Sequence, residues 1–507
     1  MTSKERKRLK EEERAIKQMH EILSGQVRLS MPKPPKKASQ ANRIGGAAAS
    51  DEEQAYLADC YTRLLRFLLP GILAELSLLD DSRDQSKIKH TLPALILYGI
   101  LMFLCHTPSR RAANREVGGS QLHELMAQFV PDFKSIPHAD TLARLLEDID
   151  TNELEAKYEG FIKEFIKSPQ FNELNPGRYL IAIDGTQKFS RDWCWDKRAQ
   201  SRNAGDPDKE RYFVYIVESV LILENGMVLP LLSETLENGE RFDGNGKQDC
   251  ETVAFKRLAN RLVNLFGKGC ATVVVDGLYA TGPIISLCKS YGWEYMISLK
   301  SECLKSVWEE FEGLRKIEPE NKLFFKCDGR DQEYHWSNGI EYVYGNNHRR
   351  LSLNMVTCKE TWYDESKRKG KPCHKTIMFS WLSSSNVNIA NVVSLCMTAR
   401  KRWRIENHFN TLKHQGYSYE HCFSYNWNAM KGYHCLMKIA NFINSFILQS
   451  QLLVEYITAE GRKGVIWKVW RYLQMHKLSN FCSEPVPFSS CRDRKKIMFG
   501  KLKLTAA

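Results

Sequence analysis

The sequence predicts an α/β protein in which a strand-rich centre is preceded and followed by helices. Three observations support this class. Apolar residues recur at intervals of three and four over residues 51–155, which is the spacing of amphipathic helices. From residue 178 the pattern changes to short apolar runs bounded by turn residues, as expected for strands. Helical spacing returns at about residue 390.

The charge of the chain bears on its partners more than on its fold. The 507 residues carry a net charge of +13, which favours nucleic acid as a partner, although a merely basic surface would give the same sum. The 15 cysteines include no C-x-x-C pair, which favours reduced thiols in a cytoplasmic chain. The longest apolar run, residues 92–105, is too short to span a bilayer, so we expect no membrane association.

The first 155 residues are predicted to form an arm and a helical domain. Residues 1–50 join a charge-dense piece to a Pro- and Lys-rich linker, and we expect a basic arm that is mobile without a partner. In the helical region 51–155, Arg110 and Arg111 lie near a helix start. A short basic face of this kind suits contact with DNA, and a plain packing domain fits the same pattern.

The strand-rich centre is predicted to begin with a three-stranded meander. The first strand ends on Asp184, and the second and third flank Asn225-Gly226, a strong hairpin signal. Pro230 places the third strand at a sheet edge, where its missing N–H does no harm. The three apolar runs cover residues 178–186, 212–223 and 228–236.

Two helix-linked strands are predicted to follow the meander. An amphipathic helix covers residues 251–266, and the strand after it ends on Asp276. The next helix has Pro283 in its first turn and Gly292 past its end, and a strand at 293–300 follows. The order β-β-β-α-β-α-β is that of the ribonuclease-H-like fold, a name that rests here on analogy.

The rest of the chain is predicted to contain a β-rich insertion and further helices. Strand patterns lie on both sides of Ser337-Asn338-Gly339, and a single helix is expected from about residue 390 to a stop at Gly416. The predicted domains are the arm 1–50, the helical domain 51–155, a catalytic domain made of 175–300 and 390–445, the insertion 301–389, and a basic helical region 446–507.

Three acids are the candidate catalytic residues. Asp184 and Asp276 each end an apolar strand and precede a glycine, so both are expected at the sheet edge where α/β proteins bind ligands. Each aspartate alone would more often close a turn. Glu406 lies in the cationic stretch "ARKRWRIENHFNTLK", with Arg402 and Lys413 on the same helical face. Ordinary i,i+4 ion pairs are the alternative interpretation of that face.

Converging carboxylates of this kind suit hard divalent cations such as Mg²⁺. Two such ions can activate an attacking water or 3′-hydroxyl and stabilise the leaving oxygen of a phosphodiester. Flanking cations, here Arg402, Arg404 and Lys413, would neutralise the DNA phosphates that approach the acids.

These residues resemble the DDE transposases of bacterial insertion sequences, in the branch with a Y-x2-R-x3-E-x6-K signature. "RWRIENHFNTLK" fits R-x3-E-x6-K, and "IDGT" and "DGLY" resemble the two aspartate motifs, with Tyr279 at the expected place. The resemblance covers about residues 175–445. One departure is Ala399, which stands where the signature has the tyrosine that grips the transposon end.

The resemblance implies a ribonuclease-H-like cut-and-paste enzyme that cleaves the inverted-repeat ends of its element and joins them to target DNA. It implies double-stranded DNA as partner, two Mg²⁺ ions per site with Mn²⁺ as a substitute, a homodimer on paired ends, and a location in the bacterial cytoplasm at the nucleoid. The implied catalytic and metal-binding residues are Asp184, Asp276 and Glu406. The DNA-binding candidates are Arg402, Lys413, Arg404, Tyr279, Arg110 and Arg111, and the candidates for a base or end contact are Trp381 and Trp193.

Two alternatives remain open on the sequence. The chain could be a decayed or repurposed transposase that binds DNA without cutting it. Ala399 supports this hypothesis, because it replaces the signature tyrosine. It could also be another ribonuclease-H-like nuclease such as a resolvase, which the long insertion and the R-x3-E-x6-K helix disfavour.

Overall fold

The computed structural model describes residues 51–130, 133–167, 171, 175, 177–203, 206, 208–239, 248–364, 373–450 and 453–476. The predicted arm at 1–50 and the basic end of the predicted C-terminal region lie outside these residues. The chain divides into two compact units, which we call the helical unit and the sheet unit. The helical unit comprises Met1–Pro176, Glu224–Pro230 and Asn410–Ala507, and the sheet unit comprises Gly177–Leu223 and Leu231–Phe409.

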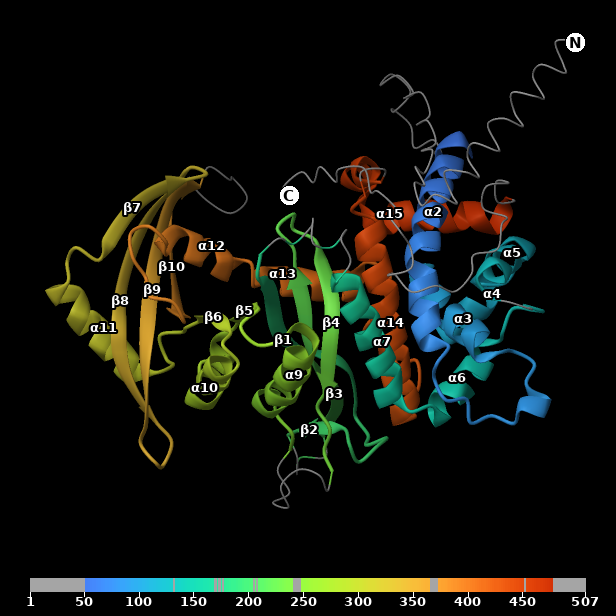
Figure 1. Cartoon of the computed structure of the whole chain (residues 1–507), viewed down its shortest axis with the longest axis horizontal. Coiled ribbons are helices and arrows are strands. Elements are labelled where there is room, and N and C mark those ends of the chain that lie inside the picture. The colour runs from blue at the N-terminus through green and yellow to red at the C-terminus, as the bar shows by residue number, and fades with distance from the viewer. Residues whose placement is uncertain are drawn as a thin grey trace, which may run out of the picture. The chain divides into compact units, whose positions relative to one another are not determined.

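The helical unit is built around one buried helix, α14 (Trp427–Ile447). Nearly every side chain of this helix is buried, and it packs against α2, α3, α6 and α7. The helices predicted in the N-terminal region are present (Figure 1). The other described α-helices that lie wholly in this unit are α2 (Asp51–Leu76), α3 (Leu92–Leu104), α4 (Arg110–Glu116), α5 (Ser120–Phe129), α6 (Ala139–Asp148), α7 (Thr151–Ile166) and α15 (Val454–Met475), with the short 3₁₀ helix η2 (Gln85–Lys87).

Local capping fixes where several of these helices begin. The side chain of Ser109 accepts a hydrogen bond from the backbone N–H of Ala112 at 3.1 Å, which starts α4. Asp150 caps α7 and Asn426 caps α14 in the same way. Each such cap stabilises its helix by about 1 kcal/mol because it satisfies an otherwise unpaired backbone donor. None of the described helices is both long enough and apolar enough to cross a membrane.

The strands described in the sheet unit form one mixed sheet (Figure 1). This sheet has ten strands. Its strand order is β2-β3-β1-β5-β6-β10-β9-β8-β7, and β4 pairs with β3. The strands are β1 (Tyr179–Arg191), β2 (Gln200–Arg202), β3 (Arg211–Ile222), β4 (Val228–Thr235), β5 (Ala271–Val275), β6 (Glu294–Ser298), β7 (Lys322–Cys327), β8 (Arg330–Tyr344), β9 (Arg349–Asp364) and β10 (Cys373–Ser383).

The predicted α/β class is confirmed. Strands β1, β5 and β6 are parallel neighbours, and the crossovers between them contain α9 (Glu251–Phe266) and α10 (Gly282–Ser290). Among the described residues of this region, the short β2 is the strand added to the predicted order β-β-β-α-β-α-β. The hairpin before β4 also forms as predicted, because Gly226 adopts a φ of 81° that suits glycine.

Strand β1 is longer than predicted. The sequence suggested that it ends on Asp184, but it continues to Arg191. The reason is its antiparallel partner β3, whose pairing extends to Arg191↔Tyr212 with an irregularity after Gln187. Parallel pairing with β5 stops much earlier, at Ala182↔Val274. Asp184 therefore lies inside a strand, just beyond the point where one of its two neighbours ends.

The insertion differs from its prediction in two respects. Ser337-Asn338-Gly339 does not separate two strands, because β8 continues through it as a bulge in which Gly339 has a φ of 78°. A helix that was not predicted, α11 (Lys305–Ile317), precedes the strands and packs against β8. The insertion strands also extend the central sheet, since β10 pairs antiparallel with β6.

The single helix predicted from about residue 390 is two helices, α12 (Val392–Arg400) and α13 (Trp403–His414). The backbone N–H groups of Lys401 and Arg402 donate to carbonyls three residues earlier, so the α-helical pattern tightens and breaks there. Arg402 consequently precedes the first turn of α13, and Glu406 lies within that turn. The chain turns at Gly416, where φ is 110°.

Candidate active site

The two candidate aspartates occupy equivalent positions on neighbouring strands. The last parallel pair between β1 and β5 is Ala182↔Val274, and Asp184 and Asp276 each lie two residues beyond it. Because side chains alternate along a strand, residues two apart share a face. The register therefore directs both carboxylates to the same side of the sheet, at the carboxyl end of the parallel strands.

Asp276 closes the turn that follows β5. Its carboxylate accepts a hydrogen bond from the backbone N–H of Leu278 at 2.9 Å and caps the short 3₁₀ helix η3 (Gly277–Tyr279). The capping role that Asp-Gly suggested is thus present, and it uses one carboxylate oxygen, Oδ1.

Asp184 lies in a partly buried, acidic environment. Its side chain is 19% exposed, and burial raises its pKa to about 6. The nearby carboxylates of Asp276 and Glu251 act in the same direction, while the backbone N–H of Gly185 and the charge of Arg402 oppose it. A carboxylate in such surroundings is stabilised by any cation that approaches it.

Arg402 is the cation that lies between two of the predicted acids. Its Nη2 is 2.7 Å from Oε1 of Glu406, and its Nη1 is 3.5 Å from Oδ2 of Asp184. The side chain is only 11% exposed, and the guanidinium also lies over the ring of Trp403, 5.0 Å from its centroid. The structure therefore connects Glu406 to Asp184 through one shared guanidinium group.

Two buried side chains, His408 on α13 and Glu218 on β3, lie close together beside the strand that carries Asp184. The cross-strand partner of Asp184 is Glu218 on β3, and its Oε2 lies 3.8 Å from Nε2 of His408. Both residues are almost completely buried: Glu218 is 1% exposed and His408 is 6% exposed. His408 follows Glu406 by two positions, so this contact lies next to the first turn of α13.

Sequence reasoning missed a fourth acid, Glu251. This residue begins α9, and its Oε2 accepts a hydrogen bond from the hydroxyl of Tyr279 at 3.1 Å. Burial raises its pKa, and hydrogen bonds from Tyr215 and Tyr279 oppose the increase. In the sequence Glu251 is an ordinary glutamate at a helix start, so no local signal distinguishes it.

The aromatic candidates differ in their exposure. Tyr279 is fully buried, and its hydroxyl donates a hydrogen bond to Glu251. Trp381 is also buried, on β10, where its ring stacks on Phe379 with centroids 5.7 Å apart. Trp193 is 48% exposed, so of the three it is the side chain that a ligand could reach in this conformation.

The cationic candidates lie in both units. Arg404 is half-buried on α13 in the sheet unit. In the helical unit Lys413 pairs with Glu420 at 3.2 Å, Arg110 pairs loosely with Asp140 at 3.9 Å, and Arg111 is exposed. Ala399, which replaces the signature tyrosine, is buried in α12.

The carboxylates suit a hard divalent cation in chemistry but do not enclose one as they stand. Asp184, Asp276 and Glu406 offer oxygen ligands, which Mg²⁺ and Mn²⁺ prefer. Within the described part of the chain, however, no three His, Cys, Asp or Glu side chains are spaced to hold an ion. The position of Arg402 gives a physical reason, because its guanidinium occupies the space between Asp184 and Glu406.

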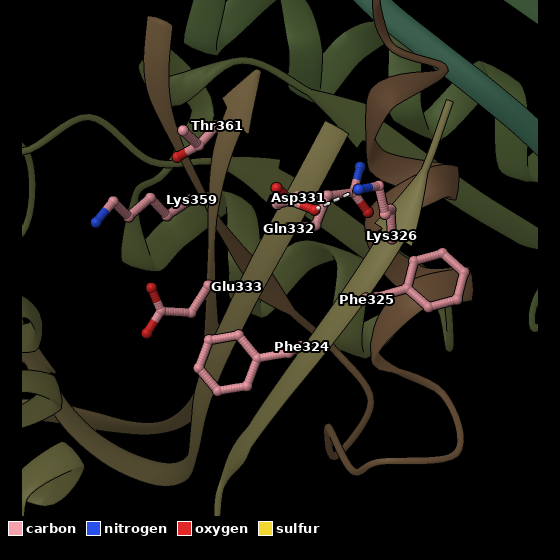
Figure 2. A pocket seen from close by; sticks show the side chains of 8 residues that line it. All are labelled: Phe324, Phe325, Lys326, Asp331, Gln332, Glu333, Lys359 and Thr361. Carbon is pink, nitrogen blue, oxygen red and sulfur yellow. Dashed lines mark ion pairs between the residues drawn. The ribbon is translucent and has the colours of Figure 1, made fainter. Parts of the chain in front are cut away.

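A separate hollow lies on the insertion and involves none of these acids. It has a volume of about 370 Å³, and its lining residues come from β7, β8 and β9 (Figure 2). Phe324 and Phe325 are exposed there, and Lys326 pairs with Asp331 at 3.4 Å. The mixed charge of this lining distinguishes it from the acidic cluster around Asp184.

The raised pKa of Asp184 predicts that its charge destabilises the metal-free protein. A carboxyl group with a folded-state pKa above its unfolded value favours folding when protonated, and this contribution is lost as pH rises through about 6. At pH 7.5 Asp184→Asn is therefore expected to raise the free energy of unfolding by about 1–3 kcal/mol. At pH 4 the variant and the native protein should differ little.

Denaturant unfolding in EDTA at the two pH values measures this effect. Asp331→Asn, an exposed aspartate on β8, serves as the control and should change neither value. A native protein that is more stable than Asp184→Asn at pH 7.5 would contradict the electrostatic account of this residue.

Two family models match the chain. Residues 251–442 match a model described as "Transposase DDE domain", and residues 73–162 match one described as "DDE_Tnp_1-associated". The first match includes Asp276 and Glu406 and begins after Asp184. No curated protein matches the chain.

Proposed function

Because the chain belongs to the DDE transposase family, we propose that it cleaves the inverted-repeat ends of its own element and joins the freed 3′-hydroxyls to target DNA. The observation that best supports this proposal is the convergence of the acids in one unit. Asp184 and Asp276 share a register position, and Arg402 links Glu406 to Asp184. A metal-dependent nuclease needs several carboxylates in one site, close to its substrate phosphate.

We propose Asp184, Asp276 and Glu406 as the catalytic residues and metal ligands. DDE transposases depend on divalent metal, and Mg²⁺ is our choice for this site, with Mn²⁺ as a substitute and two ions per site. Bound there, the metal would activate the attacking water or 3′-hydroxyl and stabilise the leaving oxygen. The protein's own contribution is to hold the three carboxylates on rigid elements, two at strand ends and one in the first turn of α13.

Arg402 has a second role in this proposal. In the free protein its guanidinium neutralises Asp184 and Glu406. A DNA phosphate offers the same planar group an equally good bidentate partner. Binding of the DNA end would therefore draw Arg402 from the carboxylates to the phosphate and leave their oxygens free for metal. Metal binding and DNA binding should consequently favour each other.

Other residues are proposed to hold the DNA. Arg404 and Lys413 on α13, and Arg110 and Arg111 at the start of α4, would contact phosphates. Trp193, which is exposed, is the better candidate for stacking on a base, since Trp381 is buried. We further propose that two copies of the protein act as a homodimer on paired ends. The predicted domain boundaries are also part of this proposal.

The proposal is tested on the DNA that flanks the gene. Short inverted repeats bracketed by direct repeats identify the ends, and a labelled fragment carrying them is incubated with the protein and Mg²⁺. We expect cleavage at the repeat boundary, followed by joining to a target plasmid. Binding without any cleavage would overturn the enzymatic proposal.

That result would instead support a protein that binds DNA without cutting it. One observation favours this second candidate. Position 399 is a buried alanine, so the chain lacks the signature tyrosine that would grip the transposon end from this position.

A further inference from the structure

Three side chains from three different elements meet beside the acids. Glu251 comes from the first turn of α9, Tyr215 from β3, and Tyr279 from η3. The Tyr279 hydroxyl donates to Oε2 of Glu251 at 3.1 Å, and the Tyr215 hydroxyl donates to the same carboxylate. We call these three residues the Glu251 clamp.

The clamp lies directly against the strand that carries Asp184. A Cβ atom placed on Gly185 would lie 2.5 Å from Oε2 of Glu251 and 2.5 Å from Cε1 of Tyr215. Only a residue without a side chain leaves room for this approach. The Glu251 carboxylate therefore packs on the backbone of β1 one residue after Asp184.

The clamp also includes a residue of the turn that carries Asp276. Tyr279 follows Asp276 by three residues, within the 3₁₀ helix that Asp276 caps. The Tyr279 ring is fully buried, and its centroid lies 5.1 Å from that of Phe255 on α9. Any movement of the Asp276 turn away from α9 would have to break the hydrogen bond from Tyr279 to Glu251, and Tyr215 on β3 binds the same carboxylate.

We propose that Glu251 is a positioning residue, which fixes the separation of Asp184 and Asp276 by accepting hydrogen bonds from Tyr215 and Tyr279. This inference rests on the proposed function, because it matters only if the two aspartates bind metal together. Like charges on Asp184 and Asp276 repel each other before a cation arrives, and the clamp opposes the resulting separation. Glu251 acts through its acceptor oxygens in this account and is not itself a ligand.

The protonation of the clamp is consistent with this role. Burial and the nearby Glu251 charge raise the pKa of Tyr279 well above its usual value. Burial likewise raises the pKa of Tyr215. Both hydroxyls thus keep their protons and remain donors at neutral pH.

Four variants separate a positioning role from direct ligation. Glu251→Ala removes the acceptor, Glu251→Gln keeps an acceptor oxygen without the charge, and Tyr279→Phe and Tyr215→Phe each remove one donor. The readout is the affinity of the full chain for Mn²⁺ by calorimetry, with thermal melting to check folding. Tyr295→Phe, which removes a hydroxyl from a buried ring on β6, is the matched control.

We expect Glu251→Ala to weaken Mn²⁺ binding by about 10- to 100-fold, as is usual when a partner that orients metal ligands is lost. Each Tyr→Phe variant should weaken it by a smaller factor, and combining Tyr279→Phe with Glu251→Ala should add nothing. Glu251→Gln should restore most of the affinity, because an amide oxygen still accepts from a hydroxyl.

Two results would overturn the inference. In the first, Glu251→Gln is as damaging as Glu251→Ala while the tyrosine variants are normal, which means that Glu251 acts by its charge. In the second, all four variants bind Mn²⁺ normally. Asp184→Ala shows which proposal has failed. If this variant also leaves Mn²⁺ binding unchanged, the proposed metal site is wrong. If it abolishes Mn²⁺ binding, the metal site stands and only the role of the clamp is wrong.

Discussion

Asp184→Asn, Asp276→Asn and Glu406→Gln are each expected to reduce DNA cleavage by about a thousand-fold or more while DNA binding persists. Each variant keeps the shape of the side chain and removes an anionic metal ligand. The metal's stabilisation of the reacting phosphate is worth several kcal/mol, and each 1.4 kcal/mol corresponds to a factor of ten in rate. The phosphate contacts that provide DNA affinity come from other residues, so binding should be retained.

Cleavage of a labelled element end and a gel-shift assay on the same fragment give the two measurements. Asp331→Asn is again the matched control, because this exposed aspartate on β8 pairs only loosely with Lys326. It should cleave at the normal rate. Normal cleavage by any one of the three site variants would remove that acid from the proposed metal site.

Arg402→Ala is expected to have opposite effects on metal binding and on cleavage. Without DNA the variant should bind Mn²⁺ about tenfold more tightly, because the guanidinium no longer competes for Asp184 and Glu406. Cleavage should fall by about 10- to 100-fold, since a charge-assisted hydrogen bond to phosphate contributes about 1.5–3 kcal/mol. Arg402→Lys should recover little of this activity, because a single ammonium cannot bridge two partners as a guanidinium does.

Calorimetry with Mn²⁺ and the end-cleavage assay measure the two effects on the same protein. Lys401→Ala, at the neighbouring position in the break between α12 and α13, controls for the simple loss of a positive charge and should leave both values close to normal. Weaker Mn²⁺ binding by Arg402→Ala would show that the guanidinium supports the metal site and does not compete with it.

Local sequence patterns predicted much of this fold because each signal is short-range. The apolar run before Asp276 and the hairpin residues Asn225-Gly226 encode their structures within a few positions, and both form as predicted. The helix at 251–266 also has the predicted bounds.

The features that the sequence did not predict depend on partners far along the chain. β1 continues past Asp184 because β3 pairs with it to Tyr212. The break before α13 coincides with Arg402, whose charge partners include Asp184, more than two hundred positions away in sequence. Glu251 belongs to the site because Tyr215 and Tyr279, which are distant in sequence and on other elements, donate hydrogen bonds to it. No window of a few residues contains that information.

The central claim is that Asp184, Asp276 and Glu406 jointly hold the metal that cleaves DNA. Anomalous diffraction from crystals of the protein bound to its element end with Mn²⁺ tests this directly. We predict an anomalous peak contacted by oxygens of all three carboxylates, with Arg402 moved to a DNA phosphate. Mn²⁺ bound elsewhere, with Arg402 still paired to Asp184 and Glu406, would contradict the account.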